Sequence, residues 1–123
     1  MARILIVDDE APIRAMLREM LVQDGYEVTE AENGAMALAR LREGAFDLLI
    51  TDLVMPEKNG LNLILDIRKE WPDLEIVAIS GGGGITGRFE YLPIAKLVGA
   101  GRVLAKPFDK AQLQSVVREA LAA

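Results

Sequence analysis

The sequence contains no cysteine and no histidine, and each absence narrows the chemistry open to the chain. Without cysteine there are no disulfides, thiolate metal ligands or thiol nucleophiles, which is common in proteins of reducing compartments. Without histidine there is no imidazole acid–base catalysis, no zinc site of the usual kind and no phosphohistidine on this chain. The chemistry that remains depends on carboxylates, hydroxyls and amines.

Long apolar segments and basic clusters are also missing. The apolar run near the N-terminus, residues 4–7, is too short for a signal peptide or a membrane span, so we predict a cytoplasmic protein with no membrane partner. The formal net charge is -5 and the 14 basic residues form no run, which argues against nucleic-acid binding. A protein partner or a small ligand is favoured instead.

The length and hydrophobic content predict one domain. A chain of 123 residues that is 51% hydrophobic has enough apolar material for a single core, so we expect residues 1–123 to form one domain. The sequence ends directly after its last predicted helix. We therefore expect no effector domain on this chain and an output that passes to another protein.

The pattern of apolar residues predicts an α/β protein with a doubly wound parallel sheet. Strands buried on both faces are indicated by short apolar runs without alternation, at residues 4–7, 48–50, 76–79 and 103–105. Residues 26–30 alternate instead, which is typical of an edge strand. Between the strands, helical periodicity predicts helices from Pro12 to before Gly25 and over residues 35–41, 61–70 and 109–121.

Individual residues predict where two of the helices begin. Asp109 is the predicted N-cap of the last helix, because its side chain can accept a hydrogen bond from a free backbone N–H. A further helix is placed from near Glu90 to before Gly99, because Pro93 fits only the first turn of a helix. Strands and helices then alternate along the chain, as a parallel sheet covered on both faces requires.

Polar residues with related chemistry follow four of the predicted strands. In parallel α/β sheets, ligands bind beyond the carboxyl ends of the strands. The residues found there are Asp8, Asp9, Glu10, Asp52, Ser80 and Lys106. Clustered carboxylates repel one another unless they take up protons or bind a hard cation, and Mg²⁺ suits an acidic cluster without histidine. A lysine and a serine beside such a cation are groups that can hold phosphoryl oxygens.

These residues resemble a known family. Asp8-Asp9, the segment from Asp52 to Gly60, Ser80 and the run Lys106-Pro107-Phe108 are similar to the receiver domains of two-component response regulators, and in particular to stand-alone, chemotaxis-type receivers. The resemblance covers essentially the whole chain. It implies a flavodoxin-like (βα)5 fold with strand order 2-1-3-4-5.

The resemblance also implies a role for each site residue. Asp52 would accept a phosphoryl group, while Ser80 and Lys106 would hold its oxygens. Mg²⁺ or Mn²⁺ would be bound by Asp9, Asp52 and the backbone carbonyl of Val54, with Asp8 acting mainly through water. The implied partners are a histidine kinase or a histidine phosphotransfer protein, and an unidentified downstream protein. Such a chain is not a conventional enzyme, although it would catalyse its own phosphorylation and autodephosphorylation.

Two features depart from the family pattern. Many receivers have an aromatic residue three positions before the lysine, where this chain has Val103, so the usual aromatic switch is not expected. The run from Gly81 to Gly84 is also unusual. We therefore expect the loop at residues 81–84 and the helix after it to carry most of the conformational change, because glycines impose little barrier to rearrangement.

Three other functions fit the sequence less well. An aspartyl-phosphate phosphatase would need a second aspartate where this chain has Val54. A flavin-binding module would need hydroxyls and glycine after the first strand, and the acidic residues 8–10 would repel its phosphate. A degenerate receiver, which binds proteins without phosphorylation, is the remaining alternative. It is disfavoured because every acceptor, metal-binding, hydroxyl and lysine position is filled.

Overall fold

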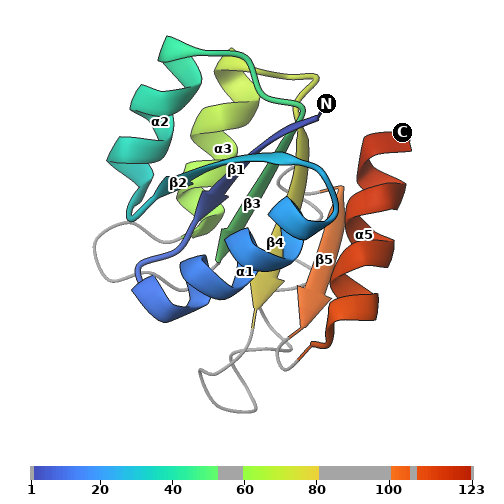
Figure 1. The fold of residues 1–123 in the computed structure, drawn as a ribbon. Helices are drawn as coiled ribbons and strands as arrows, with labels where there is room; N and C mark the ends of the chain where they lie inside the picture. Colours follow the sequence, from blue (N-terminus) through green and yellow to red (C-terminus); the bar gives the residue numbers. More distant parts are fainter. Residues whose placement is uncertain (1, 53–59, 81–100, 106–107, 123) are drawn as a thin grey trace.

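A five-stranded parallel sheet forms the centre of the computed structural model, which describes residues 2–52, 60–80, 101–105 and 108–122 (Figure 1). The strands lie in the order β2-β1-β3-β4-β5, which confirms the expected 2-1-3-4-5 arrangement. Their bounds are β1 Arg3–Val7, β2 Glu27–Ala31, β3 Leu48–Asp52, β4 Glu75–Ser80 and β5 Arg102–Ala105.

Helices cover both faces of this sheet. Their bounds are α1 Ala11–Gln23, α2 Gly34–Glu43, α3 Gly60–Glu70 and α5 Lys110–Ala122. Helices α2 and α3 lie on one face, and α1 and α5 lie on the other (Figure 1). The helix predicted near residues 90–98 and the glycine run at 81–84 fall outside the described residues.

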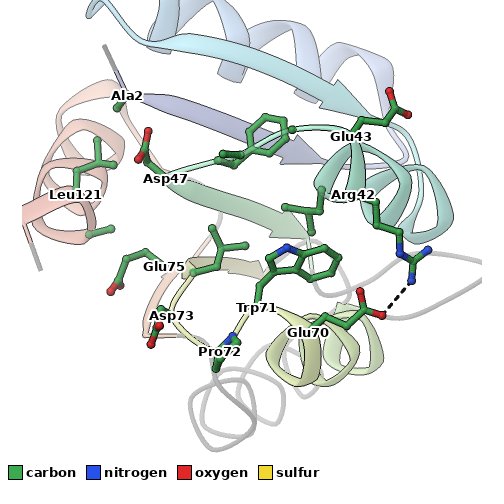
Figure 2. Close-up of a pocket in the computed structure, with 16 residues that line it drawn as sticks. Ala2, Arg42, Glu43, Asp47, Glu70, Trp71, Pro72, Asp73, Glu75 and Leu121 are labelled. Carbon is green, nitrogen blue, oxygen red and sulfur yellow. Dashed lines mark hydrogen bonds and ion pairs between the residues drawn. The ribbon is translucent and has the colours of Figure 1, made fainter.

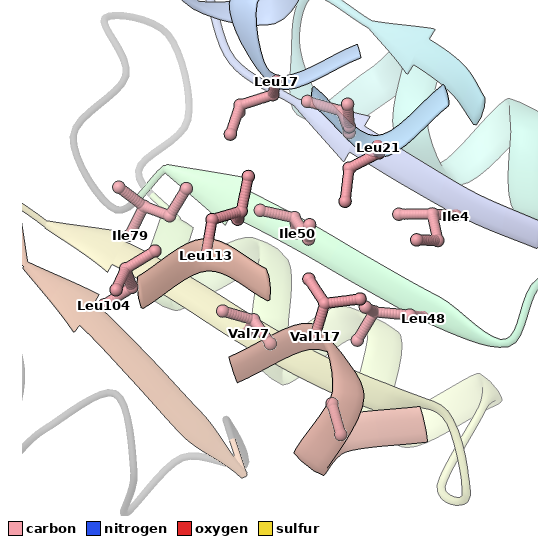
Figure 3. Packing of buried hydrophobic residues seen from close by; sticks show 12 residues of the cluster. Ile4, Leu17, Leu21, Leu48, Ile50, Val77, Ile79, Leu104, Leu113 and Val117 are labelled. Carbon is pink, nitrogen blue, oxygen red and sulfur yellow. The ribbon is translucent and has the colours of Figure 1, made fainter. Parts of the chain in front are cut away.

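Two hydrophobic clusters, one on each face, hold the helices to the sheet. Successive side chains of a strand point to opposite faces, so Leu5 and Val7 pack under α2 and α3 while Ile4 and Ile6 pack under α1 and α5. Figure 3 shows the second cluster, with Ile50 of the central strand between Leu17 of α1 and Val117 of α5. Every residue of β3 is buried. The continuous apolar runs in the sequence are thus strands covered on both sides.

Local hydrogen bonds fix the helix ends that the sequence marked. Beyond α1, Gly25 has a φ of 90°, a conformation that favours glycine, and its N–H donates to the Val22 carbonyl at 3.0 Å. The Tyr26 N–H reaches back to the Leu21 carbonyl at 3.2 Å, which completes a Schellman motif. At α5 the Asp109 carboxylate accepts from the Gln112 N–H at 2.8 Å, which confirms the predicted N-cap.

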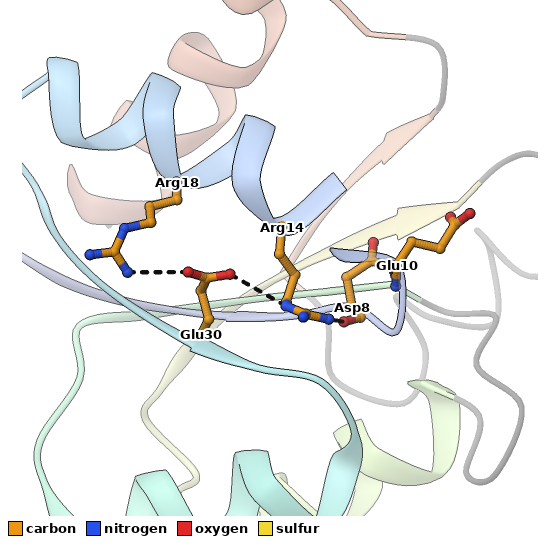
Figure 4. Close-up of polar contacts among 5 residues, drawn as sticks. All are labelled: Asp8, Glu10, Arg14, Arg18 and Glu30. Carbon is orange, nitrogen blue, oxygen red and sulfur yellow. Dashed lines mark hydrogen bonds and ion pairs between the residues drawn. The ribbon is translucent and has the colours of Figure 1, made fainter. Parts of the chain in front are cut away.

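The alternating segment is the edge strand β2, as predicted. Tyr26 and Val28 pack against the α1 and α5 side, whereas Glu27 is exposed. Glu30 faces α1, where it forms ion pairs with two arginines (Figure 4). One polar residue of β2 therefore lies between the sheet edge and the first helix, close to the carboxyl end of the strands.

Candidate functional site

The strand register brings Asp8 and Asp52 together. Val7 is the register partner of Thr51 across neighbouring strands β1 and β3, and each aspartate directly follows one of these residues. Both aspartates are almost completely buried, with 1% of Asp8 and 4% of Asp52 exposed. Two carboxylates are thus placed side by side at the carboxyl edge of the sheet, with little access to bulk water.

A third carboxylate completes an acidic group. One side-chain oxygen from each of Asp8, Glu10 and Asp52 lies within 4.8 Å of the others. Glu10 is exposed, and its backbone N–H donates a 2.8 Å hydrogen bond to Asp8 Oδ1. Asp9 is also exposed but does not belong to this group within the described part of the chain. The sequence marked Glu10 as following the first strand, but did not select it as a ligand.

The donor set of this acidic group fits a magnesium ion. Mg²⁺ prefers oxygen ligands, is held in proteins by one or two carboxylates, and keeps several waters. Carboxylate oxygens this close together repel one another, and a bound dication reverses that repulsion. The residues present therefore suit the metal that the sequence predicted.

The backbone around the two aspartates is also fixed. The Asp8 N–H donates to the carbonyl of Ala31, the last residue of β2, at 3.2 Å. The fully buried hydroxyl of Thr51 donates to the Asp52 carbonyl at 3.0 Å. Each carboxylate thus extends from a backbone position that is hydrogen-bonded locally, which limits how far it can move.

The remaining predicted site residues are only partly covered by the structure. Ser80 ends β4 and is the register partner of Ala105 in β5, so it lies at the same edge of the sheet as Asp52. Val54 and Lys106 fall outside the described residues. Val103 packs against the cluster under α2 and α3, as a residue of β5.

A groove at the opposite end of the sheet is separate from this acidic group. Figure 2 shows its lining, in which Trp71 lies near an exposed ion pair between Arg42 and Glu70, with a nitrogen-to-oxygen distance of 3.1 Å. None of the predicted site residues that the structure describes lines it. As for membranes, no helix within the described residues combines the length and apolar character needed to cross one.

Comparisons with known proteins agree with this geometry. A parallel sheet in the order 2-1-3-4-5 with buried carboxylates at its carboxyl edge defines a flavodoxin-like domain with an acidic pocket. Residues 4–118 match the family described as the response regulator receiver domain. The chain belongs to this family.

Individual relatives support the assignment. The response regulator receiver protein CpdR of Brucella abortus is 37% identical over 123 residues, which cover 100% of this chain and 99% of that protein. The transcriptional regulator NtrC of Azospirillum brasilense is 39% identical over 98% of this chain, which spans only 24% of that relative. The response regulator TrrA of Thermotoga maritima, solved with Mg²⁺ and BeF, is 36% identical with a TM-score of 0.85 and covers 98% of this chain and 100% of its own.

Family membership establishes the general function. The chain is a phosphoacceptor domain of two-component signalling. Receiver domains are signalling modules, not conventional enzymes. Receiver domains bind Mg²⁺ at their acidic pocket, are phosphorylated by histidine kinases and interact with downstream proteins. The phosphorylation-independent alternative is not favoured.

Proposed function

We propose that Asp52 is the phosphoacceptor and that Asp8, Asp9, Asp52 and the backbone carbonyl of Val54 form the Mg²⁺ or Mn²⁺ site. The observation that carries this proposal is the pairing of Asp52 with Asp8 at the carboxyl end of the central strand, where both are buried. A nucleophilic carboxylate held beside metal-binding carboxylates is the arrangement that phosphorylation of an aspartate requires.

The proposed reaction is transfer of a phosphoryl group from a partner's phosphohistidine. A carboxylate oxygen of Asp52 attacks phosphorus, the new O–P bond forms, and the P–N bond to the imidazole breaks. Ser80 and Lys106 hold the phosphoryl oxygens, which lowers the repulsion between the incoming anion and the carboxylates. The metal neutralises further negative charge when bound. Autodephosphorylation is the attack of water on the same phosphorus, which releases phosphate and restores Asp52.

The phosphorylated chain would act on another protein. We propose that residues 1–123 form a single cytoplasmic receiver that is phosphorylated by a histidine kinase or a histidine phosphotransfer protein. Its output is either docking of the phosphorylated surface or relay of the phosphoryl group to a histidine. Because residues 1–123 contain no histidine, the relay acceptor must lie outside them.

Intact-mass measurement tests the proposed chemistry. Incubated with Mg²⁺ and acetyl phosphate, the wild-type chain should gain the mass of one phosphoryl group, and a chelator should prevent the gain. Because an acyl phosphate is cleaved by hydroxylamine whereas a serine phosphate is not, hydroxylamine should remove the adduct. An adduct that survives hydroxylamine would place the phosphate on another kind of residue.

The contrast between Asp9 and Glu10 provides a second prediction. We expect Asp9→Asn to weaken Mg²⁺ affinity by at least about tenfold and Glu10→Gln by less, because a direct ligand matters more than a neighbouring charge. Calorimetric titration of both variants with Mg²⁺ measures this difference. The opposite ranking would show that Glu10, whose carboxylate groups with those of Asp8 and Asp52, takes the place assigned to Asp9.

A further inference from the structure

The carbonyl group of Asp8 is bound by an arginine of the first helix. Arg14 Nη1 donates to this oxygen at 2.6 Å, as Figure 4 shows. Hydrogen bonds from a charged donor are shorter and stronger than those between neutral groups. Together with the bond from the Asp8 N–H to Ala31 and the bond from the Glu10 N–H to Asp8 Oδ1, it fixes both ends of the Asp8 backbone and its side chain.

Arg14 is itself held in place from the edge strand. Its Nε donates to Glu30 Oε1 at 3.3 Å, so the planar guanidinium lies between β2 and the turn after β1. The Arg14 side chain is 14% exposed, whereas that of Arg18, which binds the other Glu30 oxygen at 3.1 Å, is 51% exposed. One arginine is therefore enclosed beside the acidic group, and the other is a surface partner of the same glutamate.

We propose that Arg14 is a positioning residue for the metal-binding carboxylates. The peptide bond is planar, so the Asp8 carbonyl and the Asp9 nitrogen share one plane. A strong hydrogen bond to that carbonyl therefore sets the direction from which the side chains of both Asp8 and Asp9 extend. This inference rests on the proposed function, because it takes these two residues as part of the Mg²⁺ site.

The direction of the change in Mg²⁺ affinity distinguishes a positioning role of Arg14 from a purely electrostatic one. A cation near an acidic group repels Mg²⁺, so removal of its charge alone would strengthen metal binding. Loss of positioning has the opposite effect, because carboxylates that must first be ordered bind a metal less tightly. Residues that orient metal ligands typically change affinity by about 10- to 100-fold when they are mutated.

Calorimetric Mg²⁺ titration of two matched variants tests the proposal. Arg14→Ala and Arg18→Ala each remove one positive charge and one contact to Glu30, but only Arg14 contacts Asp8. We expect Arg14→Ala to weaken Mg²⁺ affinity by about tenfold. For Arg18→Ala we expect a change of less than about twofold, because exposed ion pairs contribute little. Unchanged or tighter binding by Arg14→Ala would overturn the proposal, as would equal weakening in both variants.

A lysine pair keeps the test decisive if Arg14→Ala does not fold. Arg14→Lys and Arg18→Lys retain the charge and most of the aliphatic stem, but one ammonium cannot reproduce the fork that spans the Asp8 carbonyl and Glu30. We expect Arg14→Lys to bind Mg²⁺ more weakly than Arg18→Lys and to shift the Asp9 amide resonance, which Arg18→Lys leaves in place. Equal affinities and equal Asp9 resonances would refute the positioning role.

The outcome is distinguishable from failure of the proposed function. If the wild-type chain gains no hydroxylamine-sensitive adduct in the presence of Mg²⁺, the phosphoacceptor assignment fails whatever the arginine variants do. If the wild type gains the adduct but Arg14→Ala and Arg18→Ala bind Mg²⁺ alike, only the role of Arg14 fails.

Discussion

Asp52→Ala should abolish the phosphoryl adduct that the wild-type chain forms with Mg²⁺ and acetyl phosphate. The substitution removes the nucleophile, and the neighbouring carboxylate of Asp8 follows a different strand, β1, so we do not expect it to replace the Asp52 carboxylate at the end of β3. We expect no adduct by intact mass at a time when most of the wild type is modified. Circular dichroism verifies that the variant is folded.

The control for this prediction is an aspartate far from the acidic group. Asp73 is exposed and lies in the connection between α3 and β4, beside the groove at the other end of the sheet (Figure 2). Asp73→Ala should therefore form as much adduct as the wild type. An adduct of equal size in Asp52→Ala would mean that another residue accepts the phosphoryl group.

The strands could be predicted from the sequence because a strand that is buried on both faces has apolar residues at successive positions. Residues 48–50 form a continuous apolar run, and the structure confirms a strand there. The structure extends this strand to Asp52, and the apolar pattern missed that extension because Thr51 and Asp52 are polar. Both are nevertheless buried. Thr51 and Asp52 interrupt the apolar pattern, and they are also the residues through which β3 reaches the acidic group.

The order of the strands could not be derived from periodicity. Alternation marked residues 26–30 as an edge strand, and the ion pairs of Glu30 with α1 explain why a charged residue is tolerated there. Nothing in an apolar run specifies its neighbours, because the order depends on how the crossovers pack over the sheet. The expected order came from the family resemblance, and the structure confirms it.

The sequence predicted which site residues lie at the ends of the strands, but not how the turns after the strands arrange their side chains. Parallel strands end at a common edge, so the proximity of Asp8 and Asp52 followed from the predicted fold. The choice between Asp9 and Glu10 depends on the conformation of the turn after β1, which one sequence does not specify. Arg14 was missed for a related reason. Arg14 and Arg18 lie four residues apart on one helical face, and only the structure shows which of them reaches the Asp8 carbonyl.

The stability of the site should depend on the core directly beside it. Ile50 is fully buried in the central strand, where its register partners are Ile6 and Val77 on either side (Figure 3). Ile50→Ala removes three carbon atoms from a closely packed interior that can relax only in part. We expect the free energy of unfolding to fall by about 2–5 kcal/mol in urea denaturation.

Val22→Ala is the matched control, because Val22 is 49% exposed on α1 and its truncation should change stability by about 0.5 kcal/mol or less. A loss of stability in Ile50→Ala no greater than in Val22→Ala would contradict the packing described for β3.

Ile50 also precedes Asp52 by two residues, so the two side chains leave the strand on the same face. Under conditions in which Ile50→Ala is fully folded, the backbone hydrogen bonds around Asp8 and Asp52 remain, and the variant should still form the phosphoryl adduct. Retention of the adduct with reduced stability would separate the packing that supports the acidic group from the carboxylates that carry out its chemistry.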